Sequence, residues 1–253
     1  MNKFAMILAI LSFLVLPAQT VFADLEDGLV AYYPFNGNAN DASGNGNHGV
    51  VHGATLTQDK DGNADSAYAF GGSDYIEAPD DSSLDLSDAM TMAAWVKIDG
   101  SWPGKLDGGR IICKRHDVVG YGYTMVIKPG REVSTWTEYH DHCDTAQALG
   151  LEEWTHVATT YSTATQQIVM YINGDEVASE SATRTMSPSG YPLRIGAQSD
   201  TLANYFLGTI DEVRIYNRTL TADEISTLYT IPEPCTISLL AVGGIALLRK
   251  RKH

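Results

Sequence analysis

The chain has 253 residues, of which 44% are hydrophobic and 9% aromatic, so it can bury a core and does not have the composition of a disordered protein. Its 31 acidic residues outnumber its 17 Lys and Arg residues, which gives a formal net charge of −14. Nucleic-acid binding needs a basic face that neutralises phosphates, so this balance excludes a nucleic-acid partner. An acidic chain of this kind suits an exported protein or one that binds divalent cations through carboxylates.

The first 23 residues have the three parts of a secretory signal peptide. Lys3 provides a basic start, Phe4–Leu16 is almost wholly apolar, and Val21 and Ala23 are small enough for the −3 and −1 positions of a cleavage site. The alternative is an N-terminal membrane anchor, but the apolar run is short for a bilayer span of about 20 residues. We therefore predict a signal peptide over residues 1–23, cleaved after Ala23.

Residues 24–230 are predicted to form one all-β domain. Short runs of β-branched and aromatic residues alternate with Gly, Asn, Asp and Pro, and neither a repeat nor a linker divides them. This pattern indicates a two-sheet antiparallel jelly-roll sandwich. We expect strands at residues 29–35, 48–52, 67–70, 75–78, 90–98, 110–114, 122–127, 132–139, 154–161, 167–172, 176–180, 192–195 and 209–216.

Two local signals add detail to this domain. Asn173 and Gly174 both tolerate a positive φ, which predicts a type I′ hairpin between the strands on either side. Thr221 followed by Glu224 three residues later is a capping box, so one short C-terminal helix should begin there.

Short motifs follow one another along the body in a recognisable order. They are Gly28–Phe35, Asn36–Gly49, Ala69–Gly72, Asp74–Ile76, Met92–Val96, Trp154–Ala158, Tyr171–Gly174 and Gly208–Arg218. In this order they resemble a laminin-G-like domain of the concanavalin A-like lectin/glucanase superfamily. The resemblance covers the whole of residues 24–230 and implies a sandwich of two curved antiparallel sheets. It implies no single activity, because the same scaffold serves lectins, glycanases and adhesion modules.

The Asn- and Gly-rich loop over residues 36–47 is a candidate calcium site. Asp41 offers a carboxylate, and Asn45 and Asn47 offer amide oxygens, which are the hard ligands that Ca²⁺ prefers. A jelly roll tends to bring its first and last strands together, and the resemblance implies a structural Ca²⁺ held by Asp41 and Asp211. The alternative is a turn built from residues that accept left-handed backbone geometry.

A second acidic loop, residues 59–65, also resembles a calcium loop. It lacks the bidentate Glu and the flanking helices of an EF-hand, so a solvated acidic turn is the favoured interpretation.

The sequence does not favour an enzyme. A glycanase needs two carboxylates that face each other across a groove, whereas Asp211 and Glu212 are adjacent and should point to opposite sides of a strand. His140 and His142, with His116 or His156 as a third ligand, could form a zinc site, although a solvated loop is the favoured interpretation.

Two cysteines of the body could form a disulfide in an oxidising compartment. Cys113 and Cys143 lie 30 residues apart, whereas Cys235 lies in the C-terminal segment. We predict a Cys113–Cys143 bridge, with two buried thiols as the alternative.

Two tryptophans are candidates for ligand binding. Trp136 shares its strand alternation with Glu132, Ser134 and Glu138, and an aromatic ring among polar neighbours is typical of a surface on which sugars stack. Burial under a loop is the alternative for Trp136. Trp102, in a Gly-rich loop, and Tyr139 complete the candidate ligand-binding set.

The last segment, residues 231–253, resembles a PEP-CTERM sorting signal. Pro232, Glu233 and Pro234 precede an apolar stretch, Cys235–Leu248, and a basic end, Arg249–Lys252. The resemblance implies insertion of this segment in the membrane, cleavage by an exosortase-type enzyme, and sorting to the cell envelope or matrix of a Gram-negative bacterium. A plain tail anchor would have the same hydropathy but would not explain the Pro-Glu-Pro triplet.

Together these patterns predict an exported, non-catalytic adhesion module that binds a polysaccharide or an envelope or matrix protein. The alternatives are a structural matrix or biofilm protein without a specific ligand and, less favoured, a glycan-active enzyme.

Overall fold

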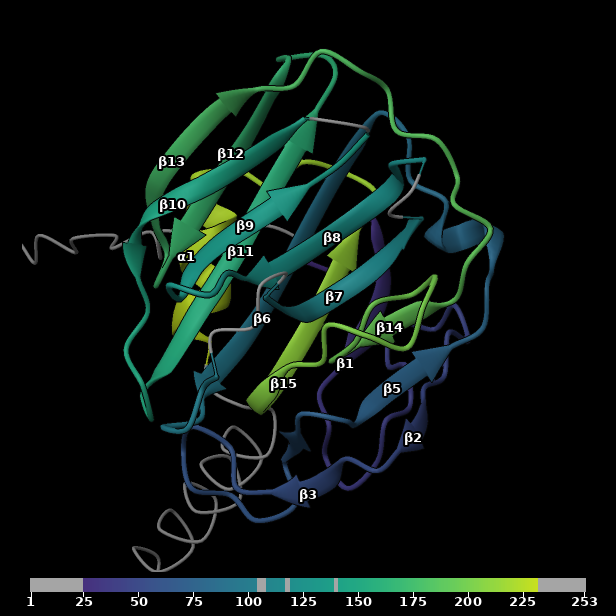
Figure 1. Cartoon of the computed structure of the whole chain (residues 1–253). Coiled ribbons are helices and arrows are strands. Elements are labelled where there is room, and N and C mark those ends of the chain that lie inside the picture. The colour runs from purple at the N-terminus through teal and green to yellow at the C-terminus, as the bar shows by residue number, and fades with distance from the viewer. Residues whose placement is uncertain (1–24, 104–107, 117–118, 139–140, 232–253) are drawn as a thin grey trace, which may run out of the picture.

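The computed structural model describes residues 25–103, 108–116, 119–138 and 141–231. Two antiparallel sheets lie face to face, with one short helix at the end of the described chain (Figure 1). The predicted fold class, an all-β sandwich with a C-terminal helix, is confirmed.

The eight-stranded sheet runs in the order β13-β12-β11-β6-β15-β4-β3, with β1 paired to β15 beside this path. Its long central strands β6 and β15 carry runs of buried residues, as expected for strands covered on both faces. The strands are β1 (Leu29–Tyr33), β3 (Thr55–Thr57), β4 (Ala67–Gly71), β6 (Ala89–Ile98), β11 (Trp154–Ser162), β12 (Gln167–Ile172), β13 (Asp175–Ser181) and β15 (Leu207–Tyr216).

The seven-stranded sheet runs in the order β10-β9-β8-β7-β14-β5-β2. A 3₁₀ turn, η1 (Ser82–Leu84), lies between β5 and β6 in the chain. The strands are β2 (Val50–His52), β5 (Tyr75–Ala78), β7 (Gly109–His116), β8 (Tyr121–Ile127), β9 (Glu132–Trp136), β10 (His142–Ala148) and β14 (Leu193–Ile195).

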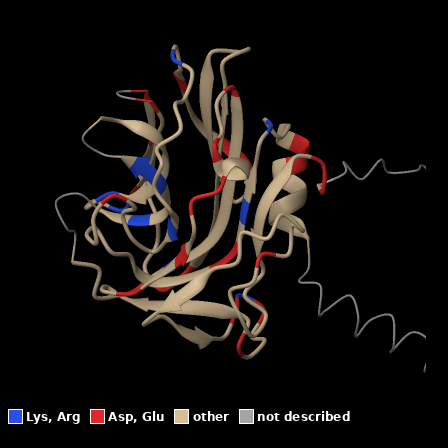
Figure 2. Cartoon of the chain, turned by 90° about the vertical axis from the view of Figure 1, so that its right-hand side faces the viewer, with Lys and Arg blue, Asp and Glu red and all other residues tan. Residues whose placement is uncertain are grey.

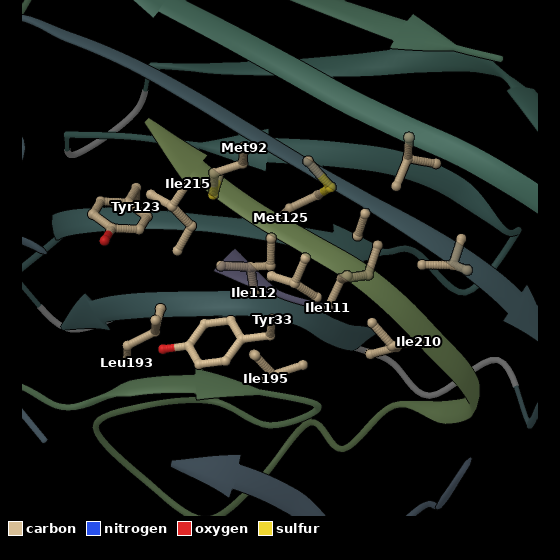
Figure 3. Packing of buried hydrophobic residues seen from close by; sticks show 14 of the residues in the cluster. Tyr33, Met92, Ile111, Ile112, Tyr123, Met125, Leu193, Ile195, Ile210 and Ile215 are labelled. Carbon is tan, nitrogen blue, oxygen red and sulfur yellow. The ribbon is translucent and has the colours of Figure 1, made fainter. Parts of the chain in front are cut away.

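The main core fills the space between the two sheets. Strand alternation sends Met92 of β6 and Ile215 of β15 inward from one sheet, and Ile112 and Met125 inward from the other (Figure 3). Tyr33 is fully buried, and its hydroxyl donates a hydrogen bond to the Asn47 carbonyl at 2.6 Å. Burial, followed by the charge of Asp41, raises the pKa of Tyr33, so this phenol stays neutral and acts as a donor.

The helix α1 (Ala222–Thr230) packs on the outer face of the eight-stranded sheet. Thr221 and Glu224 form the predicted capping box, and Ile225 and Leu228 are buried in a second hydrophobic cluster with Ala158 of the sheet. Asn173 and Gly174 both have positive φ, at 52° and 87°, which confirms the predicted hairpin between β12 and β13.

The predicted disulfide is wrong, because Cys113 and Cys143 are separate buried thiols. Cys113 lies on β7 and Cys143 on β10, three strand spacings apart in one sheet, or about 14 Å. A disulfide needs Cα atoms within about 7 Å. Cys143 also faces the core, whereas Cys113 pairs with Thr124 and contacts Ser199 on the outer side.

No helix in the described part of the chain is long and apolar enough to span a membrane. The predicted signal peptide, the predicted membrane segment and the residues Pro232, Glu233 and Pro234 lie outside the described residues.

Candidate functional site

A cavity of about 580 Å³ opens on the outer face of the seven-stranded sheet. Its floor is formed by Thr124 and Val126, which point outward from β8 because their neighbour Met125 points into the core. Trp136 and the Lys128–Pro129 turn contribute to its lining, as do residues of the 198–204 loop. The other lining residues are Arg110, Arg115, Gln198, Thr201, Ala203 and Asn204.

Trp136 stands at the end of β9 and is the largest apolar group of the cavity. Its side chain is 38% exposed, and its indole Nε1 donates a hydrogen bond to Ser134 at 2.6 Å. The Arg115 guanidinium lies 5.6 Å from the centre of the indole ring, and His142 lies beside the ring at 5.5 Å. Of the polar neighbours predicted from strand alternation, Ser134 contacts Trp136, and Arg115 and His142 from neighbouring strands add to it, so the ring is held in a fixed orientation.

Three cationic side chains line the cavity. Arg110 and Arg115 of β7 are only 8% and 3% exposed, and Arg115 donates a hydrogen bond to the Thr137 carbonyl. Lys128 lies at the rim and forms a 2.7 Å ion pair with Asp144 of β10. Burial acts to raise the pKa of Asp144, but hydrogen bonds from Lys128 and Ser134 outweigh it and hold that pKa below its usual value. Figure 2 shows several Lys and Arg positions close together on the side of the molecule away from α1.

The 198–204 loop is fastened to β7 by hydrogen bonds. The Ser199 hydroxyl accepts from the Arg115 amide at 2.7 Å and donates to the Arg115 carbonyl at 2.8 Å, and the Arg110 amide donates to the Asn204 carbonyl at 2.9 Å. The Asn204 amide in turn donates to the Gln198 side chain. The sequence did not predict that the 198–204 loop lines the cavity, because a polar loop has no periodicity that would show which strand it crosses.

Trp102, another predicted ligand-binding residue, does not line this cavity. Trp102 is half-buried, packs against the core and lies 6.0 Å from the Phe206 ring, centre to centre. Tyr139 and His140 lie outside the described residues.

The predicted calcium loop is held by hydrogen bonds from the chain itself. The Asp41 carboxylate accepts four of them, from the amides of Tyr32, Ser43 and Asn47 and from the Ser43 hydroxyl, each at 2.9 Å. Asn45 and Asn47 turn their amide nitrogens toward main-chain carbonyls of Leu29 and Val30. The groups that surround the Asp41 carboxylate are N–H and O–H hydrogen-bond donors and not further oxygen ligands, so this arrangement does not fit a cation. The calcium site stays a prediction.

Asp211, the fourth predicted calcium ligand, lies elsewhere. It is fully buried on β15 opposite Trp95 of β6, on the face that α1 covers. Next to it, Glu212 accepts a hydrogen bond from the Tyr32 hydroxyl at 2.8 Å and pairs with Arg214 at 2.5 Å. Burial opposes the charge of Arg214, but Glu212 more than offsets it, so the pKa of Arg214 is raised. Glu212 therefore belongs to a buried ion pair, and the buried Asp211 carboxylate accepts a hydrogen bond from the Glu212 amide at 2.7 Å, so these carboxylates do not face each other across an open groove.

The described histidines of the predicted zinc site are dispersed. His142 lies on β10 beside Trp136, His116 lies 3.6 Å from Asp200, and His156 is buried on β11 in the other sheet. The described residues contain no group of three His, Cys, Asp or Glu side chains that could hold a metal ion. In the second acidic loop, Asp59 accepts hydrogen bonds from the Asp61 and Asn63 amides at 2.8 Å, as in an ordinary turn.

The sequence profile of the concanavalin A-like lectin/glucanases superfamily matches residues 70–226. The chain belongs to this superfamily. The match runs from β4 into α1 and includes every lining residue of the cavity. No curated protein matches the sequence.

Three solved structures with a similar fold are domains of larger proteins. Domain 4 of the extracellular arabinanase AbnA from Geobacillus stearothermophilus, solved with arabinotriose, has a TM-score of 0.62 and 22% identity over 80% of this chain and 98% of its own. The ligand-binding domain of botulinum neurotoxin serotype D, solved with N-acetylneuraminic acid, has a TM-score of 0.66 and 16% identity over 82% of this chain and 52% of its own. The binding domain of Paraclostridial mosquitocidal protein 1 has a TM-score of 0.63 and 19% identity, over 81% and 52%.

Proposed function

We propose that this protein is a non-catalytic carbohydrate-binding module and that the cavity beside Trp136 is its binding site. The observation that carries the proposal is a partly exposed indole, fixed by Ser134 and Arg115, next to a cavity lined by amides and guanidinium groups. Sugar rings present apolar faces that stack on aromatic rings and hydroxyls that need fixed hydrogen-bond partners.

Two of the structural relatives were solved with a saccharide, arabinotriose in one and N-acetylneuraminic acid in the other. Their identities to this chain are 22% and 16%, so they support the scaffold's suitability for sugars and leave the ligand to be identified.

Binding without hydrolysis is favoured by the side chains around the cavity. Among the described residues that line it, none is Asp or Glu, whereas glycoside hydrolysis uses a pair of carboxylates. A reducing-sugar assay on β-glucans and arabinans checks this part. Turnover that a single Glu→Gln change abolishes would show that the protein is an enzyme.

A glycan array followed by titration calorimetry tests the binding site. Trp136→Ala should weaken binding of any glycan that the wild type retains by about tenfold or more, because stacking on the indole is lost. Tyr121→Ala is the matched control, since Tyr121 is 39% exposed on the same sheet but does not line the cavity. Equal binding by wild type and Trp136→Ala would refute this site, and no binding on the array would refute the function.

We also propose that the protein is exported and then sorted to the envelope or matrix through residues 231–253. The order of Pro232, Glu233 and Pro234, an apolar stretch and a basic end supports this. Deletion of residues 235–253 should prevent sorting, so that the truncated protein no longer reaches the envelope or matrix of the cells that make it. Unchanged location of the truncated protein would contradict the proposal.

A further inference from the structure

We propose that the saccharide bound beside Trp136 is acidic, and that its carboxylate or sulfate group is bound by Arg110 and Arg115. This inference rests on the proposed carbohydrate-binding function and adds the class of ligand.

The cavity differs in charge from the rest of the molecule. The chain as a whole carries 31 acidic residues against 17 basic ones, yet three of the eleven residues that line the cavity are Arg or Lys and none of the described ones is Asp or Glu. A neutral sugar needs hydroxyl-binding groups, which Asp and Asn commonly supply as acceptors, whereas guanidinium groups only donate. The lining is therefore rich in donors with a positive charge, which suits an oxyanion.

Arg110 and Arg115 are positioned to bind an oxyanion. Both are nine-tenths buried on β7, and the 198–204 loop is bonded to their main-chain atoms, so the backbone that carries them is fixed before a ligand arrives. The Arg115 guanidinium is itself oriented by a hydrogen bond to the Thr137 carbonyl. The planar fork of N–H donors on a guanidinium matches the two oxygens of a carboxylate or sulfate, so bidentate pairing suits these side chains.

Arg115, beside the Trp136 indole, links binding of the sugar ring to binding of its acidic substituent. The Arg115 guanidinium lies 5.6 Å from the Trp136 ring centre. A sugar stacked on this ring would bring a substituent of its own ring within reach of the guanidinium. The site therefore combines an apolar face for the sugar ring with a charged group for its acidic substituent.

Lys128 provides an adjustable third charge. It is more exposed than the arginines and is held by Asp144, which does not line the cavity. A bound oxyanion competes with Asp144 for this ammonium group, so removal of the Asp144 charge should strengthen binding of an acidic saccharide and leave a neutral one unaffected.

The test uses purified protein and three immobilised polysaccharides, polygalacturonate, alginate and heparin. The first two are paired with their carboxyl-reduced forms and heparin with its desulfated form, which keeps its carboxylates, so the pairs separate carboxylate from sulfate recognition. We expect one acidic form to bind, the counterpart that lacks the recognised group to bind at least about tenfold more weakly, and added salt to weaken the complex. Asp144→Asn should tighten this binding, Lys128→Gln should weaken it, and Lys60→Gln, which removes an ion pair with Asp61 in the loop between β3 and β4 of the other sheet, should leave it unchanged.

The outcomes separate this inference from the proposed function. Equal binding of polygalacturonate or alginate and its carboxyl-reduced form, with loss of both in Trp136→Ala, would overturn the inference and leave the carbohydrate-binding function standing. Binding of neutral glycans alone would do the same. Binding of no saccharide in any form would overturn both.

Discussion

The outer faces of the two sheets carry similar residue types, but α1 covers one face and a cavity opens on the other. On the eight-stranded sheet, Trp95 is only 8% exposed and stacks on Tyr229 of α1, with ring centres 5.6 Å apart. The described residues contain one α-helix, α1, which covers the eight-stranded sheet, whereas Trp136 on the seven-stranded sheet lines an open cavity. Each tryptophan has a histidine and a cation near its ring.

The difference shows that the presence or absence of a helix packed on an outer face, more than the residue type, decides whether an aromatic residue there contributes to packing or lines a cavity. Under α1 the charges are paired within the chain, as in the Glu212–Arg214 ion pair, and they contribute to a second packed layer. On the open face Arg115 and Lys128 keep access to a cavity. We therefore expect substitutions on the covered face to change stability and substitutions on the open face to change binding.

The largest effect should come from Arg214 on the covered face. Arg214→Met leaves the buried Glu212 carboxylate without its cation, so we expect the free energy of unfolding to fall by about 3–5 kcal/mol. Urea denaturation followed by tryptophan fluorescence measures this loss. The double variant Glu212→Gln with Arg214→Met should lose less than the single variant, because no unpaired charge is left buried. A loss below about 1 kcal/mol in the single variant would show that the network does not support this face.

A smaller loss is expected at the loop beside β1, which borders the covered sheet. Asp41→Ala removes a carboxylate that accepts four hydrogen bonds, so the free energy of unfolding should fall by about 2–3 kcal/mol. Calorimetry with Ca²⁺ and with EGTA should give the same Tm for the wild type, because hydrogens of the chain already surround this carboxylate. A lower Tm in EGTA would contradict this account and support the predicted calcium site.

Much of the fold could be predicted because local patterns report on it. The strand predicted at residues 90–98, the Asn173-Gly174 turn and the capping box at Thr221 all appear in the structure as expected. Strand β10 was missed, since His142–Ala148 contains mostly small and polar residues and has weak β propensity. Its position explains the error at Cys143, because only the strand order shows that two strands separate it from Cys113.

The site was predictable only in part. Trp136 could be found because its polar neighbours at alternate positions lie on one strand. Its partners Arg110 and Gln198 come from a strand two places away in the sheet and from a loop 62 residues further along the chain, and no local pattern links them. Asp211 could be assigned to β15 from sequence, but the burial of its side chain is a tertiary feature.

The pH dependence of stability offers a finer test of the covered face. Burial, followed by the charge of Arg214, lowers the pKa of His156 to about 3. In the unfolded chain an imidazole takes up a proton below about pH 6.5, whereas folded His156 stays neutral down to about pH 3. Falling pH therefore favours the unfolded state by up to about 1.4 kcal/mol per pH unit within this window.

His156→Phe removes this proton uptake and keeps an aromatic ring beside Trp95. Urea unfolding of both proteins from about pH 7 to about pH 4 should show the wild type losing stability faster than the variant, with no divergence above about pH 7. Parallel profiles would mean that His156 can be protonated in the folded protein and that the covered face is open to water.

The smallest change in stability is expected at Trp136, where the comparison of the two faces is most direct. Trp136→Ala removes a ring that is already 38% exposed and one hydrogen bond to Ser134, so it should cost about 1 kcal/mol or less. Trp95→Ala, its counterpart under α1, should cost about 3–5 kcal/mol, because the ring leaves a cavity between the sheet and Tyr229. Urea denaturation of the two variants, with glycan binding measured on the same samples below the transition, separates the two roles. A large loss of stability in Trp136→Ala would mean that this ring packs the fold, and its effect on binding would then reflect unfolding.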